Sequence, residues 1–291
     1  MTDHIPQEPP VLIRRDGSIA IITLNRPKSL NSLDFAMAQA LDLAITQVAA
    51  QADVRVLIVN GAGRAFMGGG DLNVFHRDLQ GAAQTADALI KVFHRIVRGL
   101  RAMPIPVVAS TQGAIAGGGL GLAMAADLVV AADDAKFVMG YGAIGTSPDG
   151  GTSWSLTQLL GIRRAMDMLM LGDPVDASSA LSLGMVNKVV ARADLEAETL
   201  KYAQRLAAGA SGALAKAKSL VYAAATSPLD PHLEREHAGF VASAGTADFR
   251  EGITAFFERR PAHFMFPLNL EPQIDLSLPW SITTRSENTK R

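Results

Sequence analysis

The chain has 291 residues, with 27 Lys plus Arg, 28 Asp plus Glu and a formal net charge of −1. A chain of this length buries roughly three quarters of its unfolded surface, which excludes a small scaffold held together by disulfides. The near balance of charge gives no bulk electrostatic attraction for nucleic acid. Cysteine is absent, so thiolate nucleophiles, disulfides and cysteine zinc sites are excluded as well.

The N-terminal residues 1–10 are polar and lack the basic start and apolar core of a secretory signal. The longest weakly charged stretch, 113–132, is interrupted by glycines and by Asp127, which indicates a buried helix and strand rather than a membrane span. We therefore expect a cytoplasmic protein that does not cross a membrane.

The first predicted elements are a hairpin and a helix. Residues 11–24 form two β-rich runs around Asp16-Gly17, a dipeptide that supplies the positive φ angles of a tight hairpin. Apolar residues then recur at helical spacing, which predicts an amphipathic helix over 33–50. Asn31 and Ser32 precede this helix and are residue types that cap a helix start.

Short apolar runs alternate with helical patterns through the first half of the chain. Residues 56–59, 106–109 and 128–131 are three such runs, each ended or preceded by turn residues. Strands that alternate with helices predict an α/β fold with a parallel sheet buried on both faces.

The second half of the chain is predicted to be mostly helical from about 151 to 259, with a short strand at 186–190. No low-complexity linker separates the halves. We expect a core over 11–200, a helical C-terminal region over 201–266, and a loosely ordered tail over 267–291, where the sequence is polar and punctuated by proline.

Two glycine-rich segments, 61–72 and 113–121, each follow a predicted strand. Neither is a phosphate loop, because no Gly-Lys-Ser/Thr follows, and Phe66 stands where a dinucleotide fingerprint needs a small residue. The glycines at 117–119 open a predicted helix, whose first N–H groups are unpaired and suit an anion or a developing oxyanion. The alternative is that these glycines only make tight turns and close helix packing.

Four motifs in register resemble the enoyl-CoA hydratase/isomerase (crotonase) superfamily, and the match covers about 11–265. They are residues 25–33 (NRPKSLNSL), 65–72 (AFMGGGDL), 113–119 (GAIAGGG) and 248–260 (DFREGITAFFERR). The resemblance implies the crotonase (ClpP-like) fold of repeated ββα units and assembly into a homotrimer or a dimer of trimers through the C-terminal helices. It also implies a coenzyme A thioester substrate, no separate cofactor, and a role in acyl-CoA metabolism.

The same resemblance assigns an oxyanion hole to the backbone N–H groups of Gly70 and Gly118. Two fixed N–H donors stabilise the negative charge that develops on a thioester oxygen. The two glutamates that hydratases of the superfamily use to add water fall on Gly121 and Tyr141. Two-glutamate hydration is therefore not expected.

Asp149 is the principal candidate for acid or base chemistry. Its segment, Pro148-Asp149-Gly150-Gly151, is typical of a turn, and an aspartate before a helix is often an N-cap. The segment also resembles the loop of enoyl-CoA isomerases in which an aspartate moves a proton between carbons. Burial in an apolar pocket, with Ile144 and Trp154 as expected walls, would raise its pKa toward neutral pH.

His94 is the second candidate and lies on a predicted helix over 86–101. It borders the apolar face of that helix, so one interpretation is a packed structural histidine. Positions 94, 141 and 149 also line up with the catalytic histidine, a ring-stacking tryptophan and the nucleophilic aspartate of 4-chlorobenzoyl-CoA dehalogenase. The two ring-holding tryptophans of that enzyme correspond here to Phe93 and Tyr141, which favours isomerisation over dehalogenation.

Other expected substrate contacts are Lys28, for the coenzyme phosphates, together with Asp71, Leu72 and Trp154. The histidines lie far apart without ligand spacing, so no metal site is predicted. The sequence thus predicts an enoyl-CoA isomerase that uses Asp149, Gly70 and Gly118. The alternatives are a hydratase-type lyase, an aryl-CoA dehalogenase using Asp149 and His94, and a non-catalytic acyl-CoA or RNA-binding member.

Overall fold

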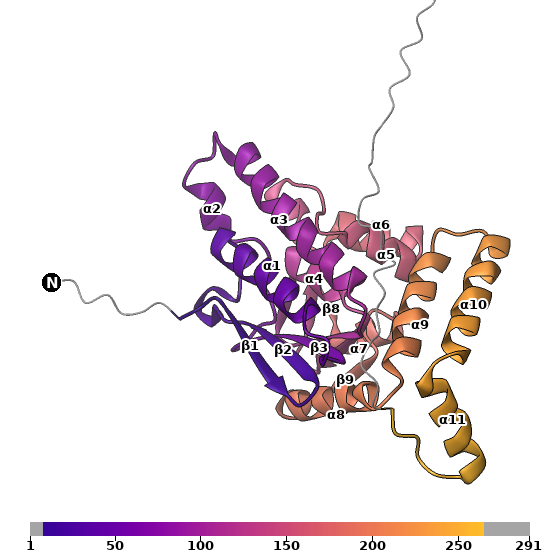
Figure 1. The fold of residues 1–291 in the computed structure, drawn as a ribbon. Helices are drawn as coiled ribbons and strands as arrows, with labels where there is room; N and C mark the ends of the chain where they lie inside the picture. The colour runs from indigo at the N-terminus through magenta and orange to yellow at the C-terminus, as the bar shows by residue number, and fades with distance from the viewer. Residues whose placement is uncertain (1–7, 265–291) are drawn as a thin grey trace, which may run out of the picture.

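The computed structural model describes residues 8–264. Within them, six strands form one sheet in the order β1-β2-β3-β4-β6-β9, and three short strands form a second sheet in the order β5-β7-β8 (Figure 1). The strands are β1 Val11–Asp16, β2 Ile19–Leu24, β3 Val56–Gly61, β4 Val107–Thr111, β5 Ala114–Ala116, β6 Leu128–Ala132, β7 Lys136–Val138, β8 Val175–Asp176 and β9 Lys188–Val190.

The predicted hairpin is present, and its turn differs in one detail from the prediction. β1 pairs with β2 in antiparallel register, with Asp16 opposite Ile19. Only Gly17 of the turn has a positive φ, +57°, whereas a type I′ turn needs two such residues. Asp16 therefore does not share the positive φ that was expected of the dipeptide.

The remaining strands of the large sheet run parallel from β2 onward, as predicted. Successive residues of β2 and β3 point to opposite faces, and each face is covered by its own apolar cluster. Helix α8, Leu195–Ala207, covers one face, while α1, Phe35–Ala49, and α3, Ala82–Ala102, lie over the other (Figure 1). This burial on both faces explains why the strands read as continuous apolar runs.

The helix predicted over 33–50 is α1, and its cap is a correction to the sequence prediction. Asp34, not Asn31 or Ser32, is the N-cap, and its carboxylate accepts a 2.8 Å hydrogen bond from the Met37 N–H. Asn31 is fully buried, and its side-chain amide lies within 3.1 Å of three backbone carbonyls of the first glycine-rich segment. Its role is therefore to hold that segment, not to start the helix.

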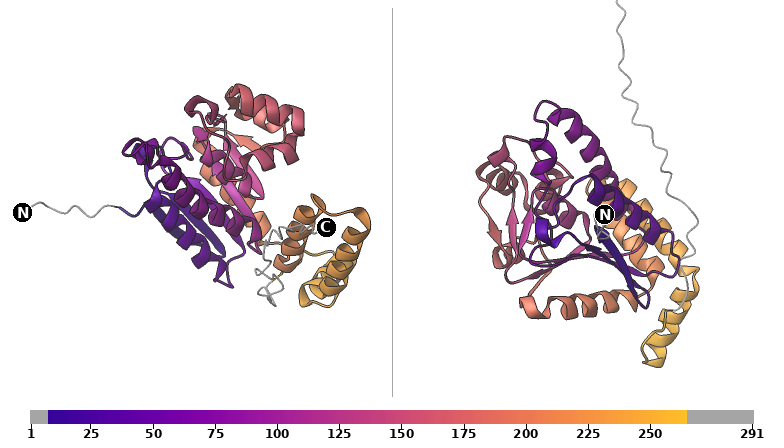
Figure 2. Two further views of the ribbon diagram at one scale, coloured as in Figure 1. Left: turned by 90° about the horizontal axis from the view of Figure 1, so that it is seen from above. Right: turned by 90° about the vertical axis from the view of Figure 1, so that its left-hand side faces the viewer.

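The second half is helical, as predicted, and the strand expected at 186–190 is the shorter β9. The other helices are α2 Leu72–His76, α4 Gly118–Ala125, α5 Thr152–Leu160, α6 Ile162–Leu171, α7 Ala177–Ser182, α9 Ser211–Ala224, α10 Leu229–Ala244 and α11 Ala247–Glu258, with short 3-10 turns η1 Pro27–Ser29, η2 Gly142–Ile144 and η3 Arg192–Asp194. Figure 2 shows α9, α10 and α11 gathered at one end of the molecule.

Helix α8 spans residue 200, the predicted boundary between the core and the C-terminal helical region. Leu195 and Ala203, near its two ends, are both buried in the cluster under the sheet. The tail expected over 267–291 lies outside the described residues. No helix within 8–264 has the length and apolar character needed to span a membrane.

A buried ion pair holds α9 against the core. The Lys218 Nζ lies 2.8 Å from the Asp127 Oδ2 and donates to the carbonyls of Leu100 and Ile105 at 3.0 and 3.2 Å. The Tyr222 hydroxyl donates to the other carboxylate oxygen of Asp127 at 2.6 Å. Burial lowers the pKa of Lys218, and the attraction of Asp127 opposes this effect. Each polar group of the pair has partners, as a buried charge requires.

Candidate active site

The two glycine-rich segments are drawn together beside the sheet. Met67 and Ala116 are linked by a 2.9 Å hydrogen bond from the Ala116 N–H to the Met67 carbonyl. A Cβ atom at Gly119 would lie only 2.3 Å from that carbonyl oxygen, and one at Gly69 would lie 3.1 Å from the Ala116 oxygen. Side chains would force the segments apart, so glycine is what permits this approach.

Gly70 and Gly118, the two expected oxyanion donors, lie on these adjoining segments. Gly118 is the first residue of α4, where helix N–H groups have no intrahelical acceptor. Gly70 lies in the first glycine-rich segment, opposite Leu33. The Leu33 N–H donates to the Gly69 carbonyl, and the Leu33 carbonyl accepts from the Asp71 N–H. Within residues 8–264, this leaves the Gly70 N–H without a backbone acceptor. Two such donors, one at a helix N-terminus, suit a developing oxyanion.

The loop before α5 leaves the Asp149 carboxylate free of the capping role that its position in the sequence suggested. Gly151 is the N-cap of α5, and no side chain caps this helix. The Asp149 backbone carbonyl instead accepts from the Thr152 N–H at 3.0 Å. Gly150 and Gly151 both have positive φ, +58° and +78°, which explains the paired glycines.

The Asp149 carboxylate is half-buried and bonded to a tyrosine. The Tyr141 hydroxyl donates to its Oδ1 at 3.0 Å and lies 3.1 Å from the Thr152 Oγ1. Burial raises the pKa of Asp149, while the hydrogen bond from Tyr141 and the charge of His94 partly oppose that rise. Burial and the neighbouring Asp149 carboxylate also raise the pKa of Tyr141, which stays a neutral donor.

The two positions that correspond to the hydratase glutamates cannot supply a carboxylate pair. A Cβ atom at Gly121 would lie 2.9 Å from the Gly150 carbonyl oxygen and 3.0 Å from the Thr152 Oγ1. The space a glutamate would enter is thus already filled. The other position, Tyr141, is bonded to Asp149. Asp149 is therefore the carboxylate available at this site.

Phe93 lies between the second glycine-rich segment, which holds Gly118, and the loop that holds Asp149. This residue is 1% exposed, and Cβ atoms built on Gly118 and Gly150 would lie 3.5 and 2.2 Å from its Cε1. Phe93 therefore packs between the two segments and is covered by them. His94 follows it on α3 and is half-buried, with its charge acting on Asp149.

Asp71 has a structural role that its sequence motif did not reveal. Its carboxylate accepts a 3.1 Å bond from the Asn73 N–H, which caps α2, and a 3.2 Å bond from the Arg26 guanidinium. Burial acts to raise the pKa of Asp71, and these hydrogen bonds outweigh it and lower the value. Leu72, at the start of α2, and Lys28, in η1, are both exposed and therefore accessible to a ligand.

Trp154 lies on α5, beyond the Asp149 loop, and stacks on an arginine, while its expected contact with the substrate stays a prediction. The Arg101 guanidinium is stacked 4.5 Å from the centroid of its ring and 3.9 Å from that of Tyr222. This cation–π arrangement joins α3, α5 and α9. Ile144, the other expected wall, is 56% exposed in η2.

Two neighbours of the site were missed from the sequence. Thr152 was noted only as part of the loop motif, yet its hydroxyl completes the hydrogen bonds around Tyr141. Phe75 lies 4.0 Å from a Cβ atom built on Gly70, the expected oxyanion donor of the first glycine-rich segment. Only the run of Gly-Gly-Thr at a helix start gave any local signal for Thr152.

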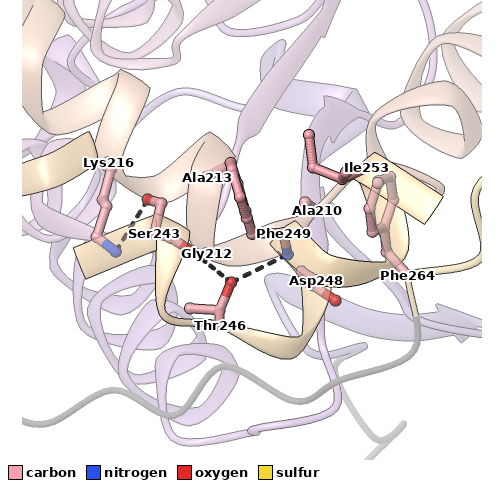
Figure 3. A pocket seen from close by; sticks show the side chains of 11 residues that line it. Ala210, Gly212, Ala213, Lys216, Ser243, Thr246, Asp248, Phe249, Ile253 and Phe264 are labelled. Carbon is pink, nitrogen blue, oxygen red and sulfur yellow. Dashed lines mark hydrogen bonds between the residues drawn. The ribbon is translucent and has the colours of Figure 1, made fainter. Parts of the chain in front are cut away.

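A separate cavity of about 260 Å³ lies between α9 and the junction of α10 with α11 (Figure 3). Its lining is mostly apolar and includes Phe249, Ile253 and Phe264. The Lys216 Nζ donates to the Ser243 hydroxyl at its edge, at 3.2 Å. None of the sequence-predicted site residues line this cavity. No cluster of metal-ligating side chains occurs within the described residues.

Residues 14–266 match the family model described as enoyl-CoA hydratase/isomerase. The chain belongs to the enoyl-CoA hydratase/isomerase family. A probable enoyl-CoA hydratase from Rhodobacter capsulatus is 36% identical over 84% of this chain and 94% of that protein. The 1,2-epoxyphenylacetyl-CoA isomerase of Escherichia coli is 34% identical over 87% of this chain and 97% of that protein.

Further relatives of this family member agree on the fold and differ in named activity. A trans-2-decenoyl-acyl-carrier-protein isomerase from Streptococcus mutans is 31% identical over 87% of this chain and 97% of that protein. A solved enoyl-CoA hydratase from Polaromonas sp. JS666 superposes with a TM-score of 0.85 and 34% identity, covering 88% of this chain and 99% of that one. The predicted family and crotonase fold are confirmed, while the isomerase-like or dehalogenase-like subgroup remains a prediction.

Proposed function

We propose that this enzyme isomerises the double bond of an enoyl-CoA thioester, with Asp149 as the proton carrier. The observation that carries the proposal is the half-buried Asp149 carboxylate, whose pKa burial raises, at a site where Gly121 and Tyr141 replace both hydratase glutamates. A carboxylate of raised pKa both takes and returns a proton near neutral pH.

The proposed reaction proceeds through an enolate. Asp149 removes a proton from C2 of a 3-enoyl thioester, and the electron pair delocalises onto the thioester oxygen. The N–H groups of Gly70 and Gly118 stabilise this charge, each by about 3 kcal/mol in the transition state. Asp149 then returns the proton to C4, which yields the conjugated 2-enoyl thioester. The reaction needs no cofactor beyond the coenzyme A that the substrate carries.

Hydration is less well supported, because it requires a second acid or base to orient water. The space beside Gly121 is filled by the Gly150 carbonyl and Thr152. Two of the relatives that match over most of the chain are named as isomerases, a 1,2-epoxyphenylacetyl-CoA isomerase and a trans-2-decenoyl-acyl-carrier-protein isomerase, while others are named as hydratases.

Dehalogenation of an aryl-CoA is the second candidate, and the nearness of His94 to Asp149 favours it. In that reaction Asp149 would attack the aryl carbon and His94 would activate the water that cleaves the ester. The covered ring of Phe93 argues against it, because a buried side chain offers no face for stacking on the substrate ring.

A panel of thioesters separates the candidates. Mixing the protein with 3-enoyl-CoA should produce the absorbance of a conjugated thioester. The isomerase proposal is overturned if only 2-enoyl-CoA is consumed by hydration, or if only a halobenzoyl-CoA releases halide. Tight binding of every thioester without turnover would instead favour a non-catalytic acyl-CoA-binding protein.

We also propose that the chain assembles as a homotrimer or a dimer of trimers through its C-terminal helices. Outside the C-terminal helices, Ile162, Met166 and Met170 of α6, which belongs to the core, form an apolar ridge that such an assembly would also cover, with exposures of 66%, 50% and 75%. Phe256 and Phe257 of α11 are exposed by 76% and 78%. Apolar surface of this extent is typical of an interface. Light scattering after size-exclusion chromatography should give three or six chain masses, and a monomer would refute the assembly.

A further inference from the structure

A short chain of hydroxyl groups ends on Asp149. It starts at Thr152, the first residue of α5, and passes through Tyr141, which precedes η2. The two hydroxyl oxygens are 3.1 Å apart, and the Tyr141 oxygen is 3.0 Å from the Asp149 Oδ1. Thr152 is fully buried and Tyr141 is 7% exposed, so the hydroxyls depend on each other for hydrogen bonds.

The direction of these hydrogen bonds follows from the number of hydrogens. An ionised carboxylate only accepts, so Tyr141 spends its one hydroxyl hydrogen on the Oδ1 of Asp149. The Tyr141 oxygen can then only accept, and Thr152 must be the donor of the second bond. Both hydrogen bonds of this hydroxyl chain therefore point toward Asp149.

This polarity distinguishes the two oxygens of the carboxylate. A proton placed on Oδ1 makes that oxygen a weaker acceptor for the Tyr141 hydroxyl; if the proton is instead donated to Tyr141, the Tyr141 hydrogen must turn toward Thr152 and the Thr152 hydrogen loses its acceptor. A proton placed on Oδ2 leaves the hydroxyl hydrogens of Tyr141 and Thr152 in their hydrogen bonds. The cost of an unsatisfied buried donor therefore favours protonation at Oδ2.

We infer that Tyr141 is a positioning residue, which fixes Asp149 so that its Oδ2 carries the substrate proton, and that Thr152 sets the direction of the Tyr141 hydroxyl. This inference rests on the proposed role of Asp149 in isomerisation. It assigns Tyr141 a task other than stacking on a substrate ring, the task that the dehalogenase resemblance implied.

Tyr141 lies close to both parts of the proposed site. Its backbone N–H donates to the Met139 carbonyl at 2.7 Å, and a Cβ atom built on Gly117 would lie 4.0 Å from its Cε1. The Tyr141 ring therefore lies beside the segment that leads into Gly118, and its hydroxyl reaches the Asp149 loop. One side chain thus spans the proposed oxyanion donor and the proposed proton carrier.

The charged and titratable groups that face Asp149 are few. His94 approaches from α3, and its positive charge favours the carboxylate form; Tyr141 approaches from the segment before η2 and favours it by donating a hydrogen bond. Thr152 of α5 is neutral, and α4 approaches the loop through Gly121, whose Cβ position lies 2.9 Å from the Gly150 carbonyl oxygen. Removal of the Tyr141 hydroxyl should therefore raise the pKa of Asp149, since one bond that favours the charged form is lost.

The test compares Tyr141→Phe, Thr152→Val and Thr152→Ser. Two measurements are made on each variant: the pH dependence of isomerisation, and the titration of the Asp149 carboxyl carbon by NMR in the ligand-free protein. Tyr222→Phe is the matched control, because it removes a tyrosine hydroxyl that donates to a different buried aspartate, Asp127, at 2.6 Å.

The expected result for Tyr141→Phe is a fall in kcat of about tenfold or more with little change in KM. The acidic limb of its pH–rate profile and the titration of Asp149 should both move to higher pH. Thr152→Val should shift both in the same direction by less, Thr152→Ser should restore wild-type behaviour, and Tyr222→Phe should leave both unchanged.

An Asp149 titration that is the same in wild type, Tyr141→Phe and Thr152→Val would overturn the inference. So would a Thr152→Ser protein that behaves like Thr152→Val, because the hydroxyl would then be irrelevant. Thr152→Val carries the test if Tyr141→Phe does not fold. Failure of the proposed function is distinguishable, since it appears as absent isomerisation by the wild type, whereas the carboxyl titration is read without substrate.

Discussion

Thr152 occupies the space into which a side chain at Gly121 would project. A Cβ atom on Gly121 would lie 3.0 Å from the Thr152 Oγ1 and 2.9 Å from the Gly150 carbonyl. The start of α5 is thus packed directly on α4, and this contact closes one of the two positions from which a hydratase of the family would act. It also holds the Thr152 hydroxyl beside Tyr141.

Gly121→Ala should destabilise the protein by about 1–3 kcal/mol, because the backbone of Gly150 must move to admit the new methyl group. Helix propensity alone would make the same change favourable by roughly 1 kcal/mol. Gly212→Ala on α9, where a Cβ atom would meet nothing within 4 Å, is the control and should be neutral or stabilising. Urea unfolding measures both variants.

Gly121→Glu should not create hydratase activity. A Gly121→Ala protein as stable as wild type, or a Gly121→Glu protein that hydrates 2-enoyl-CoA, would show that the space beside Gly121 is open.

Gly118→Pro should lower kcat about a hundredfold or more, because it removes one proposed oxyanion N–H. Gly118 is the first residue of α4, a position where proline fits a helix. A Cβ atom there would meet Phe93 at 3.5 Å, an ordinary contact. Gly118→Ala keeps the N–H and should retain most activity. Equal activity of the two variants would remove Gly118 from the oxyanion hole.

Asp149→Asn should raise the melting temperature at pH 7. Burial places the pKa of Asp149 above its ordinary value, so the folded state binds this proton more tightly than the unfolded state. Stability contributed by this group is present below the ordinary pKa of aspartate and is lost as pH rises through the raised folded pKa. Thermal unfolding as a function of pH should show the advantage of Asp149→Asn vanish in acid. A variant that is less stable than wild type at pH 7 would contradict this account.

Lys218→Met should destabilise the protein by about 3–5 kcal/mol, because it leaves Asp127 buried without its cation and strips a donor from two backbone carbonyls. Lys91→Met is the control: Lys91 pairs with Asp87 on the exposed surface of α3, where such a pair contributes about 0.3–0.5 kcal/mol. Urea unfolding of both variants tests the role of the ion pair in docking α9, and similar midpoints would refute it.

Much of the fold could be predicted from local sequence, since buried parallel strands are apolar runs and the hairpin has a glycine at its turn. The motifs also selected Gly70, Gly118 and Asp149, whose roles stay predictions. Local propensity failed where a distant segment decides the role of a side chain. Asn31 resembled a helix cap, yet it binds carbonyls more than thirty residues later in the chain.

The same limit applies to Thr152 and Trp154. The contact of Thr152 with Gly121 and Tyr141 joins three separate elements, and no spacing within one helix reveals it. Trp154 was expected as a wall of the Asp149 pocket, and that role stays a prediction. The stacking of its ring on Arg101, from the end of α3, could not be predicted, because this contact joins separate helices.

The most direct test of the central claim is the formation of conjugated thioester from 3-enoyl-CoA by wild type and Asp149→Asn, with acyl-CoA binding measured in parallel. We expect wild-type turnover and a loss of at least about a hundredfold in Asp149→Asn, with binding retained. An Asp149→Asn protein that isomerises the substrate at the wild-type rate would contradict the assignment of Asp149 as the proton carrier.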